Sequence, residues 1–477
     1  MTRPLKTWLL VSGITLVLLG ACGAALYRYG SQSTFAPGVT IAGWRVGGMT
    51  YETFQSQLTQ RLKQLSAFPV VLQTSYADVP TRKLPLGQLG VHYDQAMLTQ
   101  SMAQWTSRSL YTRIKARWTL RNVAIPLPVS VDPDQLNATV KTSWKELYAK
   151  QPIAAKRVLK AKDQITYESE QNVLRIDTAH LQEQLLTMAP TLGTVTHAAQ
   201  IGISLPIYEM SPSVTVASLR QQGITGKMAE FTTTFPLSGE GRVHNIKATA
   251  TTIQDYLMAP NDTFDYAKII AQTEAKFGYK EAPVILNGTL VPGIGGGICQ
   301  VSSTLYNAVL RSGLEIVERR NHSLPVSYVP LGQDATFANG YINFKFRNNT
   351  SSYVWIRTMT TDGAVTVKLF GHPNPSITYD IDSTVVETIQ PPVKYVNNPN
   401  LPPGLERPIS SGKAGYKVET YRTKRENGTI VSKELISKDQ YSPVPTMIAA
   451  NRGDAKPQDS APKQPIVEDG VSAFSAQ

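Results

Sequence analysis

The first thirty residues contain the longest apolar run of the chain. The run extends from Trp8 to about Tyr27, contains no charged side chain and follows Arg3 and Lys6. About twenty apolar residues can cross a bilayer as a helix, and basic residues before such a segment keep its N-terminal end in the cytoplasm. Residues 1–30 are therefore predicted to be a cytoplasmic n-region and a transmembrane signal-anchor. The bulk of this single-pass chain would then lie on the extracytoplasmic side of the cell membrane.

Two alternatives to a plain anchor stay open. The residues from Leu19 to Cys22 read Leu-Gly-Ala-Cys and look like a lipoprotein cleavage box, whose cysteine becomes lipidated. Simple cleavage of an export signal is the other alternative. An anchor helix and a lipidated Cys22 would both hold the protein on the outer face of the membrane.

Residues 34–210 switch repeatedly from strand-like to helix-like patterns. Thr50 is suited to cap a helix, and large apolar residues recur at helical spacing over residues 54–65. A short motif, two apolar residues around one further residue and then Asp, with Leu four places later, occurs three times. Its acidic residues are Asp94, Asp132 and Asp177. Each Asp can cap the helix that follows, so we predict duplicated α+β modules in which these carboxylates are structural.

A linker and a second α+β domain follow these modules. Residues 211–227 contain proline and glycine and are predicted to be the linker. Residues 228–373 form the next predicted domain. In it, Asn245 is suited to cap a helix that ends before Pro260, and a second helix is predicted over residues 301–311.

Strands dominate the remainder. Apolar and polar residues alternate at 341–346 and 365–369, which is typical of half-buried antiparallel sheet. Residues 376–448, with an Asn-Gly turn at 427–428, predict a small all-β C-terminal module. Residues 449–477 are rich in Asp, Pro, Gln and Ser and are predicted to be disordered. The fold class is thus α+β multidomain behind an N-terminal membrane segment.

The net charge narrows the choice of partners. There are 47 Lys and Arg residues against 35 Asp and Glu residues, a formal net charge of +12. Such a balance favours a polyanionic neighbour. Because the chain is predicted to be exported, we expect anionic lipid or anionic wall polymer rather than nucleic acid.

The densest chemical signal is a glycine-rich segment that leads into the second predicted helix. Gly295, Gly296 and Gly297 stand just before Cys299. Glycine permits positive φ angles and lets a ligand approach the main chain. At a helix N-terminus the dipole and the free amides stabilise a thiolate, and the amides of residues 297–300 could form an oxyanion hole. Cys299 is therefore the predicted nucleophile.

A thiolate nucleophile works with a base, and the chain has six histidines. His322 is preferred, because the segment after Gly313 could return it to the N-terminus of the helix; His244 is the second choice. Alternatively, His322 is a loop histidine that binds water or phosphate. Cys22 lies in the membrane segment and cannot pair with Cys299, so Cys299 is predicted to be a free cysteine. A free cysteine can also be simply a small buried hydrophobic residue, and this alternative stays open.

Other chemistries lack the residues they need. No Lys follows the glycines, so a phosphate-binding loop is not predicted. No two histidines have metal-ligand spacing and no second cysteine is near Cys299, so neither a metal, a cofactor nor thiol–disulfide exchange is expected. The acidic pairs Asp262 with Asp265 and Glu315 with Glu318 fit capping and solvated charge better than glycoside hydrolysis.

Several strings between residues 230 and 372 resemble the VanW family. The longest begins at Gly295 and reads Gly-Gly-Gly-Ile-Cys-Gln-Val-Ser-Ser-Thr-Leu-Tyr-Asn-Ala. The others lie at 231–235, 242–246, 318–323, 328–332 and 334–336. The upstream repeats resemble the peptidoglycan-binding modules that often precede a VanW domain. Residues 416–448 resemble, less closely, a small glycine-named β module common in wall-associated proteins.

The resemblance implies acyl transfer on peptidoglycan, because some VanW-domain proteins are described as L,D-transpeptidases. Cys299 would attack the carbonyl after the third residue of a stem peptide, release the terminal D-alanine and pass the acyl group to an amine of a neighbouring stem, forming a 3-3 cross-link. His322 would transfer protons, with Asp334 orienting it. The residues expected to bind substrate or stabilise the oxyanion are Gly296, Gly297, Ile298, Gln300, Ser302 and Arg242.

Two other functions stay open. A non-catalytic peptidoglycan-binding or scaffolding protein would use the same modules with Cys299 simply packed. A hydrolase would use the same thiol on wall peptides. In every case the expected partners are peptidoglycan stem peptides, anionic wall polymers and the membrane.

Overall fold

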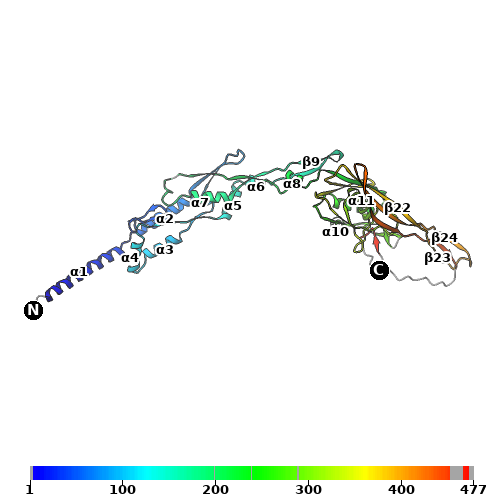
Figure 1. The fold of residues 1–477 in the computed structure, drawn as a ribbon. Helices are drawn as coiled ribbons and strands as arrows, with labels where there is room; N and C mark the ends of the chain where they lie inside the picture. The colour runs from blue at the N-terminus through cyan, green and yellow to red at the C-terminus, as the bar shows by residue number, and fades with distance from the viewer. Residues whose placement is uncertain (1–3, 198, 238, 287–288, 452–465, 472–477) are drawn as a thin grey trace. The chain divides into compact units, whose positions relative to one another are not determined.

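A computed structural model describes residues 4–197, 199–237, 239–286, 289–451 and 466–471 (Figure 1). The chain divides into two compact units. Unit 1 comprises Met1–Ala154 and Glu170–Ser213, and unit 2 comprises Ala155–Ser169 and Val214–Gln477.

Unit 1 begins with the helix α1 (Pro4–Gly30). Its part from Leu10 to Gly30 has 21 residues and is apolar enough to cross a membrane; within the described ranges no other helix is. Cys22 lies on this helix with its side chain exposed. The predicted N-terminal apolar helix is therefore present.

The rest of unit 1 is built from small sheets and short helices. The helices are α2 (Tyr51–Ser66), α3 (Ala96–Trp105), α4 (Leu110–Thr119), α5 (Pro133–Ser143), α6 (Lys145–Ala149) and α7 (Thr178–Met188). The strands are β1 (Thr40–Ile41), β2 (Trp44–Arg45), β3 (Pro69–Gln73), β4 (Arg82–Pro85), β5 (Val91–Tyr93), β6 (Ala124–Ile125), β7 (Val129–Val131), β10 (Val173–Ile176), β11 (Ile201–Ser204) and β12 (Ile207–Met210). They pair in the orders β2-β1-β6, β11-β3-β4, β5-β7 and β10-β12.

Two of the three acidic residues of the sequence motif cap helices, as predicted. The carboxylate of Asp132 accepts from two backbone N–H groups in the first turn of α5, and that of Asp177 accepts from one in α7. Asp94 differs: the N-cap position of α3 is Gln95, which makes no side-chain cap, and Asp94 accepts from the N–H of Ala96 from one residue further out. Thr50 caps α2 in the same way as Asp177 caps α7. Since each helix N-terminus leaves free amide donors, these side chains are structural.

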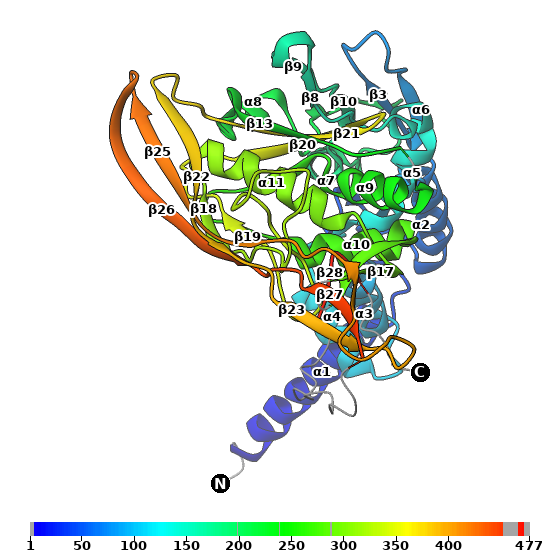
Figure 2. The same ribbon diagram turned by 90° about the vertical axis from the view of Figure 1, so that its right-hand side faces the viewer.

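Unit 2 is centred on a four-stranded antiparallel sheet of order β13-β21-β20-β14. Its strands are β13 (Gly226–Thr234), β14 (Tyr256–Met258), β20 (Val354–Thr361) and β21 (Ala364–Gly371). The helix α11 (Ile298–Ser312) packs against β13 and β21, and α9 (Glu240–Ile253) packs against β20 (Figure 2). The helix α10 (Tyr266–Phe277) packs on α9. Every residue from Ile298 to Leu310 is buried, so α11 is the central element of this core.

Smaller sheets and a long ribbon surround this core. The remaining elements are β8 (Lys156–Leu159), η1 (Ala161–Asp163), β9 (Ile165–Glu168), α8 (Val216–Gln221), β15 (Thr263–Asp265), β16 (Glu281–Leu286), β17 (Thr289–Ile294), β18 (Glu315–Glu318), β19 (Lys345–Arg347), β22 (Ile377–Ile389), β23 (Val393–Asn397), β24 (Glu406–Ser410), β25 (Gly415–Glu426), β26 (Thr429–Tyr441), β27 (Thr446–Ala450) and β28 (Val467–Glu468). Their sheet orders are β8-β9, β15-β19-β18, β17-β16-β28, β22-β25-β26 and β23-β27-β24. The long curved strands β22, β25 and β26 form the ribbon seen in Figure 2, and α11 contacts β22.

The alternation expected at 365–369 is present, since Val365, Val367 and Leu369 are buried and the residues between them are half-buried.

Asn245, in contrast, caps no helix. It lies inside α9, fully buried, and its side-chain amide bonds to the backbone of Lys280 and Gly296. An asparagine that follows a polar stretch resembles a cap in sequence, whereas its actual partners are far along the chain.

Two boundary regions also differ from expectation. The stretch 211–227, predicted as a linker, contains α8 and the start of β13. In the stretch predicted to be disordered, β27 reaches Ala450 and residues 466–471 include β28. The average composition of 449–477 hides the short apolar and acidic motif that folds. Residues 452–465 and 472–477 lie outside the described residues.

Replacing the cap of α5 tests the structural role of the repeated aspartates. Asp132→Ala is expected to lower the free energy of unfolding of unit 1 by about 1 kcal/mol, the usual value of a helix N-cap. Tryptophan fluorescence during urea unfolding of the full chain in detergent measures this, because all tryptophans but Trp355 lie in unit 1. Asp78→Ala, in an exposed position of the same unit, is the control. Equal midpoints for Asp132→Ala and wild type would contradict the assignment.

Candidate active site

The turn before α11 requires its glycines. Gly295 and Gly297 have φ angles of 101° and 110°, which residues with a side chain rarely adopt. Gly296 has an ordinary φ, but a Cβ there would lie 2.4 Å from the carbonyl oxygen of Pro283 on β16. The chain can therefore enter α11 so close to β16 only with glycine at these positions.

The backbone amides at the start of α11 are all engaged. Those of Ile298 and Gln300 donate to the carbonyls of Gly295 and Gly297, both at 3.2 Å. The amides of Gly297 and Cys299 donate instead to the carboxylate of Asp469, at 3.0 and 2.6 Å. The donors predicted for an oxyanion thus include two that already bind a negative charge.

Cys299 is fully buried. Its Sγ accepts a hydrogen bond from the N–H of Phe337 at 3.0 Å. Burial, followed by the negative charge of Asp469, raises the pKa of the Cys299 thiol well above its ordinary value. This differs from the expected lowering by the helix N-terminus, because the Asp469 carboxylate has taken the position where the helix favours an anion.

His322 and Asp334 form a buried pair, as predicted. Nδ1 of His322 lies 2.6 Å from Oδ2 of Asp334, and the backbone N–H of His322 donates to the same oxygen at 2.7 Å. Burial favours the neutral ring, but the hydrogen bond and charge of Asp334 outweigh it and raise the pKa of His322. Nε2 of His322 is buried and has no hydrogen-bond partner in the described part of the chain. Asp334 therefore fixes the ring and leaves Nε2 for another group.

Asp334 is held by residues that the sequence did not indicate. Arg319 bonds its side chain and its backbone carbonyl, and Tyr441 at the end of β26 donates to its Oδ1. Arg319 also pairs with Asp439 on the same strand. Burial would raise the pKa of Asp334, but His322 and Arg319 outweigh it and lower that pKa to about 2. Asp334 is thus a stable anion that orients His322.

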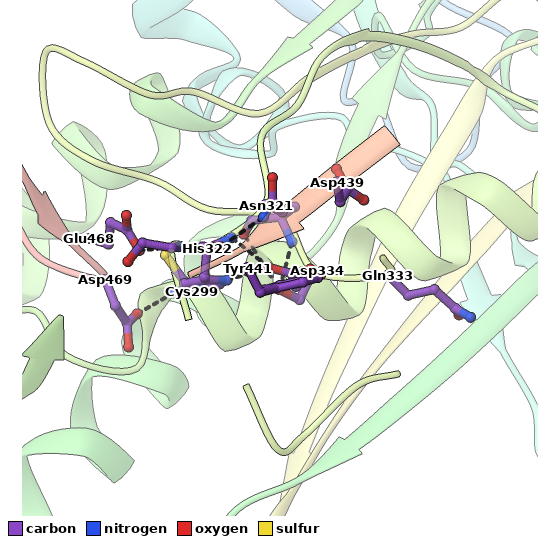
Figure 3. A network of polar contacts seen from close by, with 12 residues as sticks. Cys299, Asn321, His322, Gln333, Asp334, Asp439, Tyr441, Glu468 and Asp469 are labelled. Atoms are coloured by element: carbon purple, nitrogen blue, oxygen red, sulfur yellow. Dashed lines mark hydrogen bonds and ion pairs between the residues drawn. The ribbon is translucent and has the colours of Figure 1, made fainter. Parts of the chain in front are cut away.

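Cys299 and His322 belong to one polar network (Figure 3). Asp334, which pairs with His322, lies three residues before Phe337, whose amide bonds the sulfur. The network also joins them through residues 468 and 469: Ser323, next to His322, donates to Glu468 from its amide and its hydroxyl, while Cys299 donates to Asp469. Within the described residues no hydrogen bond joins Sγ of Cys299 to the ring of His322.

The other predicted site residues have supporting roles. Gln300 accepts from Arg242 at 3.0 Å and donates to Thr233 and to the carbonyl of Thr234 on β13. Ser302 donates to the carbonyl of Ala335 at 2.6 Å.

Two predicted residues act through their carbonyls. That of Gly296 accepts from Asn245, and that of Ile298 accepts from the hydroxyl of Tyr266. Together these bonds fix the helix start and the segment that carries Asp334.

A cavity of about 840 Å³ opens beside the network. Its lining includes His322, Tyr328, Arg242, Gln300 and Asp469. Lys413, which precedes β25, lines it as well. Cys299, which is fully buried, is not part of the lining.

The other histidine and carboxylate candidates make ordinary structural contacts. His244 points its Nε2 to the carbonyl of Gly278 at 3.0 Å, outside the network. Asp262 and Asp265 accept backbone N–H groups at turns and helix starts, and Glu315 and Glu318 pair with basic residues of β19. No cluster of three or more metal-ligating side chains occurs among the residues that are described.

Comparison with known families and proteins identifies two regions of unit 2. Residues 241–370 match the VanW like protein family, and residues 381–451 match the G5 domain. The chain is 41% identical over 146 residues to the uncharacterized protein YoaR of Bacillus subtilis, a match that covers 31% of this chain and 48% of YoaR. It is 29% identical over 156 residues to the vancomycin B-type resistance protein VanW of Enterococcus faecalis, covering 32% and 57%. The chain thus spans about half the length of each relative.

Two solved structures are similar to a small part of the chain. The G5 domain structure of an IgA1 protease has 29% identity and a TM-score of 0.14, covering 17% of this chain and 93% of that one. The crystal structure of HP0197-G5 has 20% identity and a TM-score of 0.12, covering 16% and 96%.

The domain matches indicate a cell-wall-associated, extracytoplasmic protein, which agrees with the N-terminal apolar helix. The resemblance read from the glycine and cysteine string is confirmed, and the small β module following it is a G5 domain. The chain thus contains a VanW-like domain that is followed by a G5 domain.

Proposed function

We propose that this protein modifies peptidoglycan by acyl transfer through Cys299, as a cysteine L,D-transpeptidase. The observation that carries the proposal is His322, whose Nδ1 is fixed by Asp334 and whose buried Nε2 has no partner among the described residues. A histidine held in this way suits proton transfer for a nucleophile in the same network. Cys299 is the thiol of that network.

In the proposed reaction the sulfur of Cys299 attacks the carbonyl carbon after the third residue of a stem peptide. The thiol proton passes to Nε2 of His322, and amides at the start of α11 stabilise the oxyanion. The bond to the terminal D-alanine breaks, and its amine leaves with the proton from His322. An amine of a second stem then attacks the thioester carbonyl and gives up a proton to His322. The C–S bond breaks, the sulfur of Cys299 takes this proton back from His322, and the 3-3 cross-link is formed.

The rest of the chain would hold the enzyme against its polymer. The helix α1 anchors it in the membrane in this proposal, with lipidation of Cys22 as the alternative. The unit 1 modules and the G5 domain would bind the wall, and the excess of basic residues would favour anionic wall polymers.

A second candidate is a non-catalytic peptidoglycan-binding or scaffolding protein. The full burial of Cys299 and its hydrogen bond from Phe337 favour this candidate. Small buried cysteines commonly have only a packing role. The two candidates differ in whether the thiol reacts.

Removal of the thiol tests the reaction directly. The full chain in detergent is incubated with disaccharide-tetrapeptide fragments, and the products are analysed by mass spectrometry. Wild type is expected to form a dimer with loss of D-alanine, whereas Cys299→Ala forms none, because the acyl-enzyme needs the sulfur. Cys22→Ala is the matched control and should behave as wild type. If the only product is a monomer that has lost D-alanine, the protein is a hydrolase. If the substrate stays unchanged but binds both wild type and Cys299→Ala, the non-catalytic scaffolding function is favoured.

The His322–Asp334 pair predicts a pH dependence. His322 accepts a proton only when neutral, so the rate of D-alanine release is expected to rise as the pH passes the raised pKa of His322. Asp334→Asn removes the charge that raises this pKa, and the inflection should move to lower pH while the rate falls about 10²-fold or more. Asp382→Asn, on the exposed face of β22, is the control. An unchanged inflection in Asp334→Asn would remove His322 from the role of base.

A further inference from the structure

We infer that the region between β16 and the N-terminus of α11 is a binding site for a short, extended peptide that carries a carboxylate, and that residues 466–471 of this chain occupy it as an intramolecular ligand. The inference deepens the proposed function, on which it rests for the identity of the competing substrate. The binding itself can be measured without any catalysis.

The main chain of residues 466–471 binds as an added strand. In β28, Val467 pairs with Leu286 and Glu468 with Ile285, both on β16. The sheet order is β17-β16-β28, so β16 would be an edge strand without this segment. Addition of an extended peptide to such an edge is a common mode of peptide recognition. The amide of Val471 continues the contact by donating to the carbonyl of Ile294 at 3.0 Å.

A sharp turn carries the acidic side chain to the helix. Asp469 has a φ of 63°, and a Cβ on the following Gly470 would lie 2.9 Å from the side chain of Val467. The carboxylate of Asp469 thereby reaches the amides of Gly297 and Cys299.

Further contacts fix the segment on both sides. Arg242 lies 3.4 Å from the carboxylate of Asp469. The amide of Asp469 donates to the carbonyl of Phe337, and Glu468 accepts both bonds from Ser323. Figure 3 shows Glu468 and Asp469 beside Cys299 and His322. Both acidic side chains of this short segment thus meet complementary groups of the site.

The site extends beyond the segment that fills it. Asp469 lines the cavity of about 840 Å³ together with His322 and Lys413. The buried Nε2 of His322 has no partner in the described residues, and Lys413 offers a cation for a further anionic group. A peptide that displaced the tail could therefore use the same edge and helix amides and reach His322 as well. Short stem peptides with free carboxylates have this chemistry.

The accessibility of Cys299 reports on occupancy of the site. In a Cys22→Ala chain Cys299 is the only thiol, so its rate of labelling by a maleimide in the folded full chain can be followed. Asp469→Asn removes the anion from the helix amides and should release the segment, raising the labelling rate at least tenfold. Asp362→Asn, exposed in the turn between β20 and β21, is the matched control and should label as slowly as the parent. Thermal unfolding checks that both variants stay folded.

A synthetic peptide with the sequence of residues 466–471, blocked at both ends, provides the second measurement. Added to the Asp469→Asn chain, it should restore slow labelling in a saturable manner. The same peptide with Asn in place of its Asp should not.

The outcomes separate this inference from the proposed function. The inference is overturned if the folded Asp469→Asn chain is labelled no faster than the parent, or if the peptide does not slow the labelling of Cys299. Either result counts whatever the enzyme assay shows. If wild type forms no cross-link but the peptide still slows the labelling of Cys299, the binding site is supported and the proposed catalytic role is refuted.

Discussion

The N-terminus of α11 is a buried helix end, and its unpaired amide donors constrain everything around it. Amides that leave solvent without an acceptor are costly, so each needs a partner. Two of them, the amides of Ile298 and Gln300, donate to carbonyls of the glycine turn, which is possible only with the positive φ angles found there. The other two, at Gly297 and Cys299, need an acceptor from outside, and Asp469 supplies it. The turn, the tail segment and the thiol are thus parts of one arrangement.

A second buried arrangement joins the G5 domain to the VanW-like domain. Arg319 pairs with Asp334 and with Asp439, and Tyr441 bonds Asp334 from the same strand, β26. Buried charges are tolerated when each has its full set of partners, and removal of one partner is strongly destabilising. β26 therefore does more than complete the G5 domain. It supplies groups that hold the anion beside His322.

Local patterns in the sequence predicted the parts of the site that depend on local structure. The glycine run led into a helix with Cys299 in its first turn, and the pairing of His322 with Asp334 was expected from the family strings. The helix-capping aspartates of unit 1 followed from their spacing to the next apolar residue. In these cases the partner lies within a few positions, or in one of the strings that resemble the VanW family.

Contacts across long separations could not be predicted in this way. Asp469 lies 170 residues from Cys299, and Tyr441 lies 107 residues from Asp334. Asp469 also stands in a stretch whose average composition indicates disorder, although Val467 and Val471 are buried. A composition average over 29 residues cannot detect a six-residue segment that folds against another part of the chain. A short apolar-acidic-acidic-Gly-apolar motif within such a stretch was the one available signal.

The same helix end also explains why the thiol is protonated in this arrangement. A thiolate at Cys299 and the carboxylate of Asp469 would both draw on the N-terminal dipole of α11, and their like charges repel. With Asp469 bound, the carboxylate takes that stabilisation, and the pKa of Cys299 is raised by burial and by this neighbour. A substrate that brings a neutral carbonyl to the amides in place of the carboxylate would remove the competing charge. In the proposed acyl transfer, binding of the acyl donor and activation of Cys299 would then be the same event, because both require Asp469 to leave the helix.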